Sequence, residues 1–170
     1  MKHEALYNVG FNANEWFALG MIALGATGMA LAPKRFTPTQ ALFNASIGVF
    51  LAHAFDHTLA LPPFDYYDLN DRSAYELFDF ISYAMYAPYG YFYIYLAQRF
   101  RIRGFLVIPY IAVWVCLAAA VEWCSLRFGL FHYKHGYILA YSIPIYAFLQ
   151  TLHLTVYRRV FERPSVGPGE

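Results

Sequence analysis

The sequence predicts an all-α integral membrane protein, a bundle of five transmembrane helices with the N-terminus outside and the C-terminus inside. Three observations support this fold class. The 170 residues are 59% hydrophobic and only 14% charged, far to the apolar side of an average soluble domain. Five apolar stretches approach the length of about 20 residues with which a helix crosses a bilayer. The lysines and arginines are also distributed unevenly between the connections.

The five predicted helices occupy residues 14–32, 39–61, 77–98, 104–127 and 137–157. Helices are preferred to strands because the stretches are long and lack the alternating pattern, about ten residues in length, of a membrane barrel. Together they predict a single domain over residues 1–163, followed by a disordered tail at 164–170 that is rich in proline and glycine.

The first predicted helix ends in Ala30-Leu31-Ala32, a sequence that also resembles a signal-peptide cleavage site. The segment before it carries one lysine and two glutamates instead of a basic region, and Pro33 follows directly. We therefore expect this helix to be retained as a membrane span.

The second predicted helix carries His53, Asp56 and His57 near its outer end. Positions i, i+3 and i+4 share one face of a helix, so three polar groups converge there. Imidazole and carboxylate suit zinc or a similar metal, which makes these residues candidate metal ligands. The alternative is an interfacial pair, Asp56 and His57, that caps the end of the helix.

The third predicted helix bears a polar stripe with spacings of 4, 3, 4 and 3, formed by Asp79, Tyr83, Tyr86, Gly90 and Tyr93. Such a stripe should face other helices and not lipid. Pro88 predicts a kink near the middle of the helix, which would expose backbone carbonyls to a binding site. The alternative is a tolerated bend with the tyrosines hydrogen-bonded in the core.

The fourth and fifth predicted helices add further polar residues. Glu122 lies near the outer interface, where it could face Asp79 or stand as a surface glutamate beside Trp123. On the fifth helix, one face carries Ser142, Tyr146, Gln150, His153 and Tyr157.

Orientation follows from the basic residues, because short cytoplasmic loops retain them. With five crossings, the side of the N-terminus holds four of the twelve, namely Lys2, Arg72, Arg127 and Lys134, and the other side holds eight. Nine of the eleven acidic residues lie on the side with fewer basic residues. The outer face is therefore predicted to be acidic and the inner face basic.

Several motifs occur in a recognisable order: FDYYDLND at 64–71, YELFD at 75–79, YAPYGY at 86–91, VEW at 121–123, GLFHYK at 129–134 and YSIPIY at 141–146. In these motifs the chain resembles a family of small uncharacterised multipass membrane proteins from Bacillus-like bacteria, over about residues 52–157. The resemblance implies a location in the bacterial cytoplasmic membrane and lends no activity. It also implies a common site formed by Asp65, Asp68, Glu76, Asp79 and Glu122.

The leading functional hypothesis is binding or transport of a cation or small polar solute through an outward-facing acidic cavity lined by tyrosines. The candidate binding residues are Asp65, Asp68, Glu76, Asp79, Tyr83, Tyr86 and Glu122. Proton coupling would pass through Asp79, Glu122 and His53.

Two other hypotheses belong to different classes of protein. One is a metal-dependent enzyme acting on a lipid headgroup at the outer leaflet, with His53, Asp56 and His57 as ligands. The other is a non-catalytic accessory subunit of a membrane complex. A divalent metal is the candidate cofactor, while haem is disfavoured because His53 and His153 lie at different depths. The protein is expected to contact the lipid bilayer and to form a homo-oligomer or join a larger membrane complex. It is not expected to bind nucleic acid.

Overall fold

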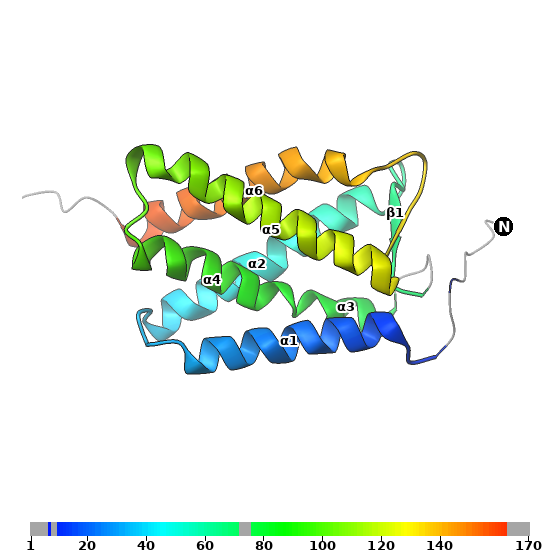
Figure 1. The fold of residues 1–170 in the computed structure, drawn as a ribbon, viewed down its shortest axis with the longest axis horizontal. Helices are drawn as coiled ribbons and strands as arrows, with labels where there is room; N and C mark the ends of the chain where they lie inside the picture. Colours follow the sequence, from blue (N-terminus) through cyan, green and yellow to red (C-terminus); the bar gives the residue numbers. More distant parts are fainter. Residues whose placement is uncertain (1–6, 8–9, 72–75, 163–170) are drawn as a thin grey trace, which may run out of the picture.

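A computed structural model of the chain describes residue 7 and residues 10–71 and 76–162, so the predicted tail at 164–170 lies outside the described residues. The prediction of an all-helical protein is confirmed. The elements are α1 (Ala13–Leu31), α2 (Pro38–Leu59), β1 (Tyr67–Leu69), α3 (Leu77–Tyr83), α4 (Tyr86–Arg99), the short 3-10 helix η1 (Gly104–Leu106), α5 (Val107–Phe128), β2 (Phe131–Tyr133) and α6 (Leu139–Phe161). The long helices lie side by side along the molecule (Figure 1).

Local chemistry explains where the helices begin and end. Asn12 caps α1 in a capping box with Glu15, and Thr37 caps α2 in the same way with Gln40. Each box satisfies backbone N–H groups that have no partner within the helix. At the C-terminal end of α5, Gly129 adopts a left-handed conformation with φ 78°, which favours glycine.

The third predicted helix is two helices and not one. The chain turns at Ala84 and Met85, between α3 and α4, before it reaches Pro88. Proline has no N–H group, so Pro88 cannot donate to the carbonyl of Ala84. That carbonyl instead accepts from Ala87 at 3.2 Å, which closes a tighter turn. By contrast, α6 continues through Pro144.

Helix α2 packs against α4, α1 also packs against α4, and α5 packs against α6. The crossing of α2 and α4 is close because Gly48 and Gly90 meet there. A Cβ added to Gly90 would lie 2.5 Å from the carbonyl oxygen of Asn44 and 2.8 Å from the Cα of Gly48. Glycine is required on both helices because backbone atoms occupy the space of a side chain.

A two-stranded antiparallel sheet joins the loop after α2 to the loop after α5, and the sequence did not predict it. Tyr67 pairs with Tyr133, and Leu69 pairs with Phe131. We call the two loops with their sheet, residues 60–71 and 129–138, the cap. The cap lies at the end of the bundle where α1, α3 and α6 begin (Figure 1).

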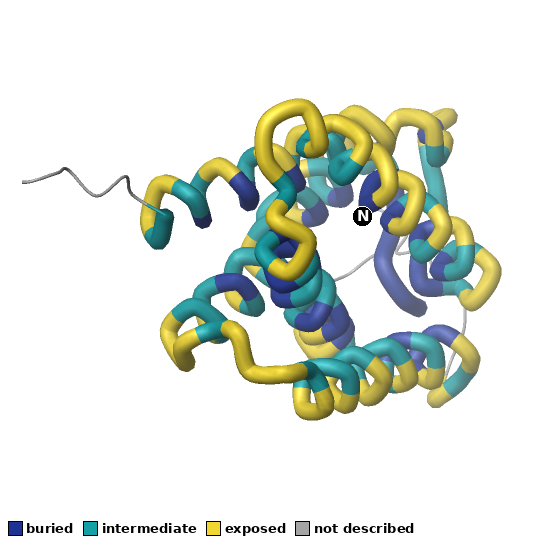
Figure 2. Tube along the Cα trace, turned by 60° about the vertical axis from the view of Figure 1, so that its left-hand side comes forward, coloured by how far each residue is buried: buried dark blue, intermediate teal, exposed yellow. Residues whose placement is uncertain are grey.

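Many large apolar side chains are exposed, and several polar side chains are buried beside the apolar core. Large apolar side chains are exposed on α1, α2, α5 and α6, among them Leu24, Phe50, Ile108 and Phe148, whereas none is exposed on α4. Figure 2 shows exposed positions along the outside of the helices. Buried polar residues include Asn14, Asn44, Glu122, Gln150 and His153.

Two helical segments in the described part of the chain are long and apolar enough to cross a membrane by length and composition, residues 104–128 and 139–161. Only 17% and 22% of their most apolar parts, respectively, are buried inside the protein. A bundle with five membrane spans is therefore a proposal, which is argued below.

Candidate functional site: a cavity between the helices

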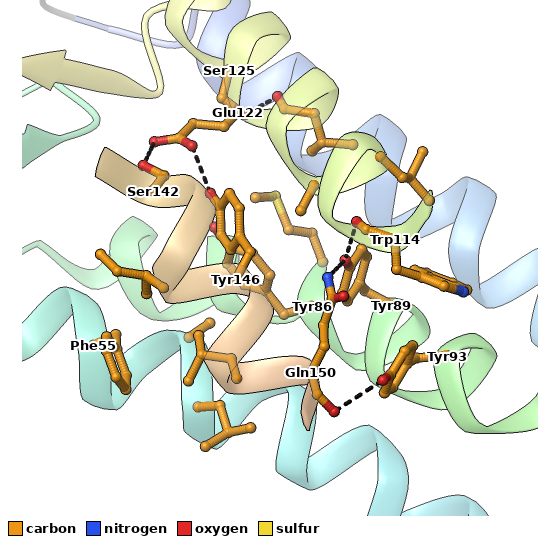
Figure 3. A pocket seen from close by; sticks show the side chains of 18 of the residues that line it. Phe55, Tyr86, Tyr89, Tyr93, Trp114, Glu122, Ser125, Ser142, Tyr146 and Gln150 are labelled. Atoms are coloured by element: carbon orange, nitrogen blue, oxygen red, sulfur yellow. Dashed lines mark hydrogen bonds between the residues drawn. The ribbon is translucent and has the colours of Figure 1, made fainter. Parts of the chain in front are cut away.

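A cavity of about 490 Å³ lies between α1, α2, α4, α5 and α6, and the cap closes one end of it. Most of its walls are apolar or aromatic. They include Met21, Leu51, Phe55, Leu59, Met85, Phe92, Trp114, Leu117, Val121, Ile145 and Leu149. A small number of polar groups lie at particular points of this wall (Figure 3).

Glu122 of α5 is the most extensively bonded of these polar groups. It is 7% exposed. Its Oε1 accepts from the hydroxyl of Tyr133 at 2.6 Å and from Ser142 at 2.7 Å, while Oε2 accepts from Tyr146 at 2.8 Å. The bonds from Ser142 and Tyr146 are visible in Figure 3. Three hydroxyl donors, from the cap and α6, thus fix this carboxylate at the wall of the cavity.

Asp56 of α2 is the second carboxylate in the wall, and it is 8% exposed. Its Oδ1 accepts from the hydroxyl of Tyr67 at 2.5 Å. The hydroxyl of Tyr83 also interacts with this carboxylate, and Oδ2 is buried without a hydrogen bond of ordinary geometry among the described residues. Since Tyr67 and Tyr133 are direct partners in the sheet, the cap places one tyrosine on each carboxylate.

The wall away from the cap is organised around Gln150 of α6. Its Nε2 donates to the hydroxyl of Tyr89 at 2.8 Å, and that hydroxyl donates to the carbonyl of Trp114 at 3.0 Å. The hydroxyl of Tyr93 donates to the carbonyl of Gln150 at 2.9 Å (Figure 3). The Oε1 of Gln150 is buried without a hydrogen-bond partner in the described structure.

His153 lies one turn beyond Gln150, where the cavity ends. Its Nε2 is 3.1 Å from the Oδ1 of Asn44 on α2, and both side chains are buried. Asn44 in turn donates to the carbonyl of Gln40 at 2.9 Å. These bonds tie α6 to α2 through polar groups in the interior.

The predicted polar face of the fifth helix is confirmed. Ser142, Gln150, His153 and Tyr157 are buried, and Ser142, Tyr146, Gln150 and His153 line the cavity. Helical spacing alone identified this face because all of its residues lie on one uninterrupted helix.

The predicted acidic site is only partly assembled. Tyr86 and Glu122 line the cavity, but the other predicted binding residues do not. Asp65 and Asp68 lie in the cap, where the Nζ of Lys134 donates to Asp65 at 2.6 Å and to Asp68 at 2.7 Å. These two carboxylates therefore hold the cap closed, and they do not reach the cavity.

Glu76 and Asp79 lie at the start of α3 and not in the described wall of the cavity. The Oδ2 of Asp79 accepts from the backbone N–H of Glu76 at 2.6 Å in a capping box, and its Oδ1 accepts from Asn70 at 2.5 Å. Asp79 and Glu122 therefore have different hydrogen-bond partners, and the route for protons through Asp79, Glu122 and His53 stays a prediction. Tyr83 lies against His53, with ring centroids 4.9 Å apart.

The three predicted metal ligands on α2 are not brought together. The rings of His53 and His57 lie 5.2 Å apart along the helix, whereas Asp56 bonds to Tyr67 and lines the cavity. In the described part of the chain, no group of three or more histidine, cysteine or acidic side chains is arranged to hold a metal ion. Asp56 lines the cavity, whereas His53 and His57 are not among its described lining residues.

Ion pairs and hydrogen bonds to two aspartates stabilise the cap. Burial alone would lower the pKa of Lys134, but the hydrogen bonds and charges of Asp65 and Asp68 raise it above the ordinary 10.5. Partial burial, together with the hydrogen bond and charge of Asp68, raises the pKa of Tyr7 to about 12. The Tyr7 ring also stacks on His132, with centroids 3.8 Å apart.

Several lining residues were not predicted from the sequence. Tyr67 and Tyr137 lie in connections, where no helical periodicity marks a face. Tyr89 and Trp114 lie on helices with many aromatic residues, where composition does not separate a cavity wall from a surface exposed to lipid.

Comparison with protein-family models, curated proteins and solved structures finds no match to this chain.

Proposed function

We propose that this is an integral membrane protein of the bacterial cytoplasmic membrane whose cavity binds a small amphipathic molecule. The five helical passes would span the bilayer, with the cap outside. The exposed apolar side chains and the buried polar residues support this, since lipid solvates apolar surface without cost while polar groups in a membrane must find partners inside the protein. The basic residues Arg99, Arg101, Arg103, Arg158 and Arg159 belong to the end opposite the cap, which supports a C-terminus inside.

The proposal that the protein binds a small molecule rests on the cavity. Its volume of about 490 Å³ lies in the range of small-molecule sites, roughly 300–1,000 Å³. Such sites combine apolar walls with a few fixed polar groups, as this one does with Asp56, Glu122 and Gln150. An apolar body would occupy the space between the helices while a polar group reaches the carboxylates beneath the cap.

This proposal narrows the hypothesis of a cation or small polar solute. A fully hydrated solute would leave the aromatic and aliphatic walls in contact with water, at a cost proportional to their area. An amphipathic molecule satisfies both parts of the cavity. Passage of the molecule across the membrane would follow if the cap opens.

Binding can be followed through Trp114, which lines the cavity. The chain contains three tryptophans, so Trp16→Phe with Trp123→Phe leaves Trp114 as the only one. In lipid nanodiscs, ten-carbon amphiphiles should change its fluorescence saturably. Ala118→Phe should abolish the change because Ala118 lines the cavity, whereas Ala120→Phe on the exposed side of α5 should not. Fluorescence changes that are linear and identical in both variants would reject the binding site.

The membrane topology is tested with introduced cysteines in a chain lacking Cys116 and Cys124. Phe64 is exposed in the cap, and Thr39 is exposed in the first turn of α2. A membrane-impermeant maleimide should label Phe64→Cys in intact cells and Thr39→Cys only after permeabilisation. Labelling of both in intact cells would contradict the proposed crossing of α2.

A further inference from the structure

We infer that the polar group accepted by the cavity is an organic cation, an amine or ammonium on an apolar body, held between Asp56 and Glu122. This inference rests on the proposed binding function and specifies its ligand. The ligand would be drawn from amphipathic amines and not from anionic or neutral amphiphiles.

The charges around the cavity are the first argument. Among the described residues, Asp56 and Glu122 are the carboxylates that line it, and no lysine or arginine does. The nearby ammonium group of the cap, on Lys134, is already bonded to Asp65 and Asp68. The lining imidazole, His153, lies at the opposite end and bonds to Asn44. A cationic ligand would supply the counter-charge that the lining residues do not.

The second argument is the supply of hydrogen bonds. Asp56 Oδ2 and Gln150 Oε1 are buried acceptors without a hydrogen bond of ordinary geometry among the described residues. A buried acceptor left unsatisfied is costly, so Asp56 beneath the cap favours a ligand whose polar group donates there, while Gln150 lies in the wall away from the cap. An ammonium group donates up to three hydrogen bonds and accepts none. Hydrogen bonds from such a group to a carboxylate are about twice as strong as neutral ones.

The aromatic residues around the carboxylates are the third argument. Tyr86 and Tyr146 both lie within electrostatic reach of Asp56 and Glu122. Phe55 and Tyr67 complete this end of the wall. The faces of aromatic rings attract ammonium groups, and more strongly where water is excluded. The same surroundings would repel a carboxylate or phosphate group.

The test compares three amphiphiles with the same ten-carbon chain: decylammonium, decanol and decanoate. Each is titrated at pH 7 into nanodiscs of zwitterionic lipid containing the chain with Trp114 as its only tryptophan. Affinities are expressed per mole fraction in the bilayer, measured with protein-free nanodiscs. Decylammonium should bind at least about tenfold more tightly than decanol, equivalent to about 1.4 kcal/mol, and decanoate should show no saturable binding.

Variants then assign the preference to the two carboxylates. Asp56→Asn and Glu122→Gln should each remove the preference for decylammonium while changing the affinity for decanol by less than about twofold. Asp79→Asn is the matched control because Asp79 is a buried carboxylate outside the cavity wall. It should retain the preference in full.

The outcomes separate the two proposals. Equal affinity for decylammonium and decanol, or tighter binding of decanoate, overturns the inference and leaves the binding site standing. Saturable binding of none of the three overturns the proposed function itself. The comparison of decylammonium, decanol and decanoate uses the chain with Asp56 and Glu122 intact. It therefore decides the inference even if a carboxylate variant fails to fold.

Discussion

Replacing Gly90 by alanine adds a single methyl group, and it should destabilise the helix bundle. The added Cβ would lie 2.5 Å from the carbonyl oxygen of Asn44, 2.8 Å from Gly48 Cα and 3.0 Å from Gly48 N. All three atoms belong to the backbone of α2, so no rotation of a side chain relieves the overlap. The two helices must move apart, and they carry Asp56 and Tyr86 of the cavity.

The expected magnitude follows from two opposing effects. Forcing an extra methyl group into a packed interface costs about 1–3 kcal/mol, and contact with backbone on every side places this case near the upper end. Alanine is favoured over glycine within a helix by about 1 kcal/mol. The net loss in the free energy of unfolding should therefore be about 2 kcal/mol.

The measurement is unfolding of purified protein in mixed micelles of mild detergent and SDS, followed by circular dichroism. Gly20→Ala on α1 is the control because its Cβ would meet nothing within 4 Å. That variant should be as stable as the unmodified protein or slightly more stable. A Gly90→Ala variant that matches Gly20→Ala in stability would refute the close packing of α2 on α4.

Three further predictions concern the cap and the membrane. Lys134→Met should lower the stability by about 2 kcal/mol because it leaves the side chain of Asp68, 2% exposed, without its charged donor. Arg103→Met should have no measurable effect because its ion pair, at 3.8 Å, is largely exposed. Since the pKa values of Lys134 and Tyr7 are both raised, the cap should keep its stability from neutral pH up to about pH 10. It should loosen as pH rises towards and past 12, which the ultraviolet absorbance of tyrosinate would follow. Cys116 is exposed on α5, so it should react with a polar maleimide in detergent but not in intact vesicles, and equal reactivity in both would argue against α5 as a membrane span.

The helices could be predicted because their signals are local. An apolar stretch of about 20 residues specifies a helix through its own composition, and the boundaries are set by neighbouring capping residues such as Asn12 and Thr37. The break before α4 was placed too late, at Pro88. The missing N–H of a proline affects a carbonyl four residues earlier, so the chain turned at Ala84 and Met85.

The candidate site was predicted where it lies on one helix and missed where it joins several. Ser142, Gln150 and His153 share a face of α6, which spacing reveals. The same reasoning grouped His53 with Asp56, but it could not show that Asp56 bonds to Tyr67 in the cap. Spacing shows which residues point the same way, not which neighbour they meet.

By itself, the sequence determined the all-helical class, the approximate ranges of every predicted helix except the third, and the polar face of α6, because each depends on residues close together in the chain. Only the tertiary structure decided that the carboxylates divide between two places. Asp65 and Asp68 bind Lys134 in the cap, while Asp56 and Glu122 line the cavity. The physical reason is that the cap forms by pairing strands more than 60 residues apart, whose register depends on backbone hydrogen bonds that leave no local pattern in the sequence.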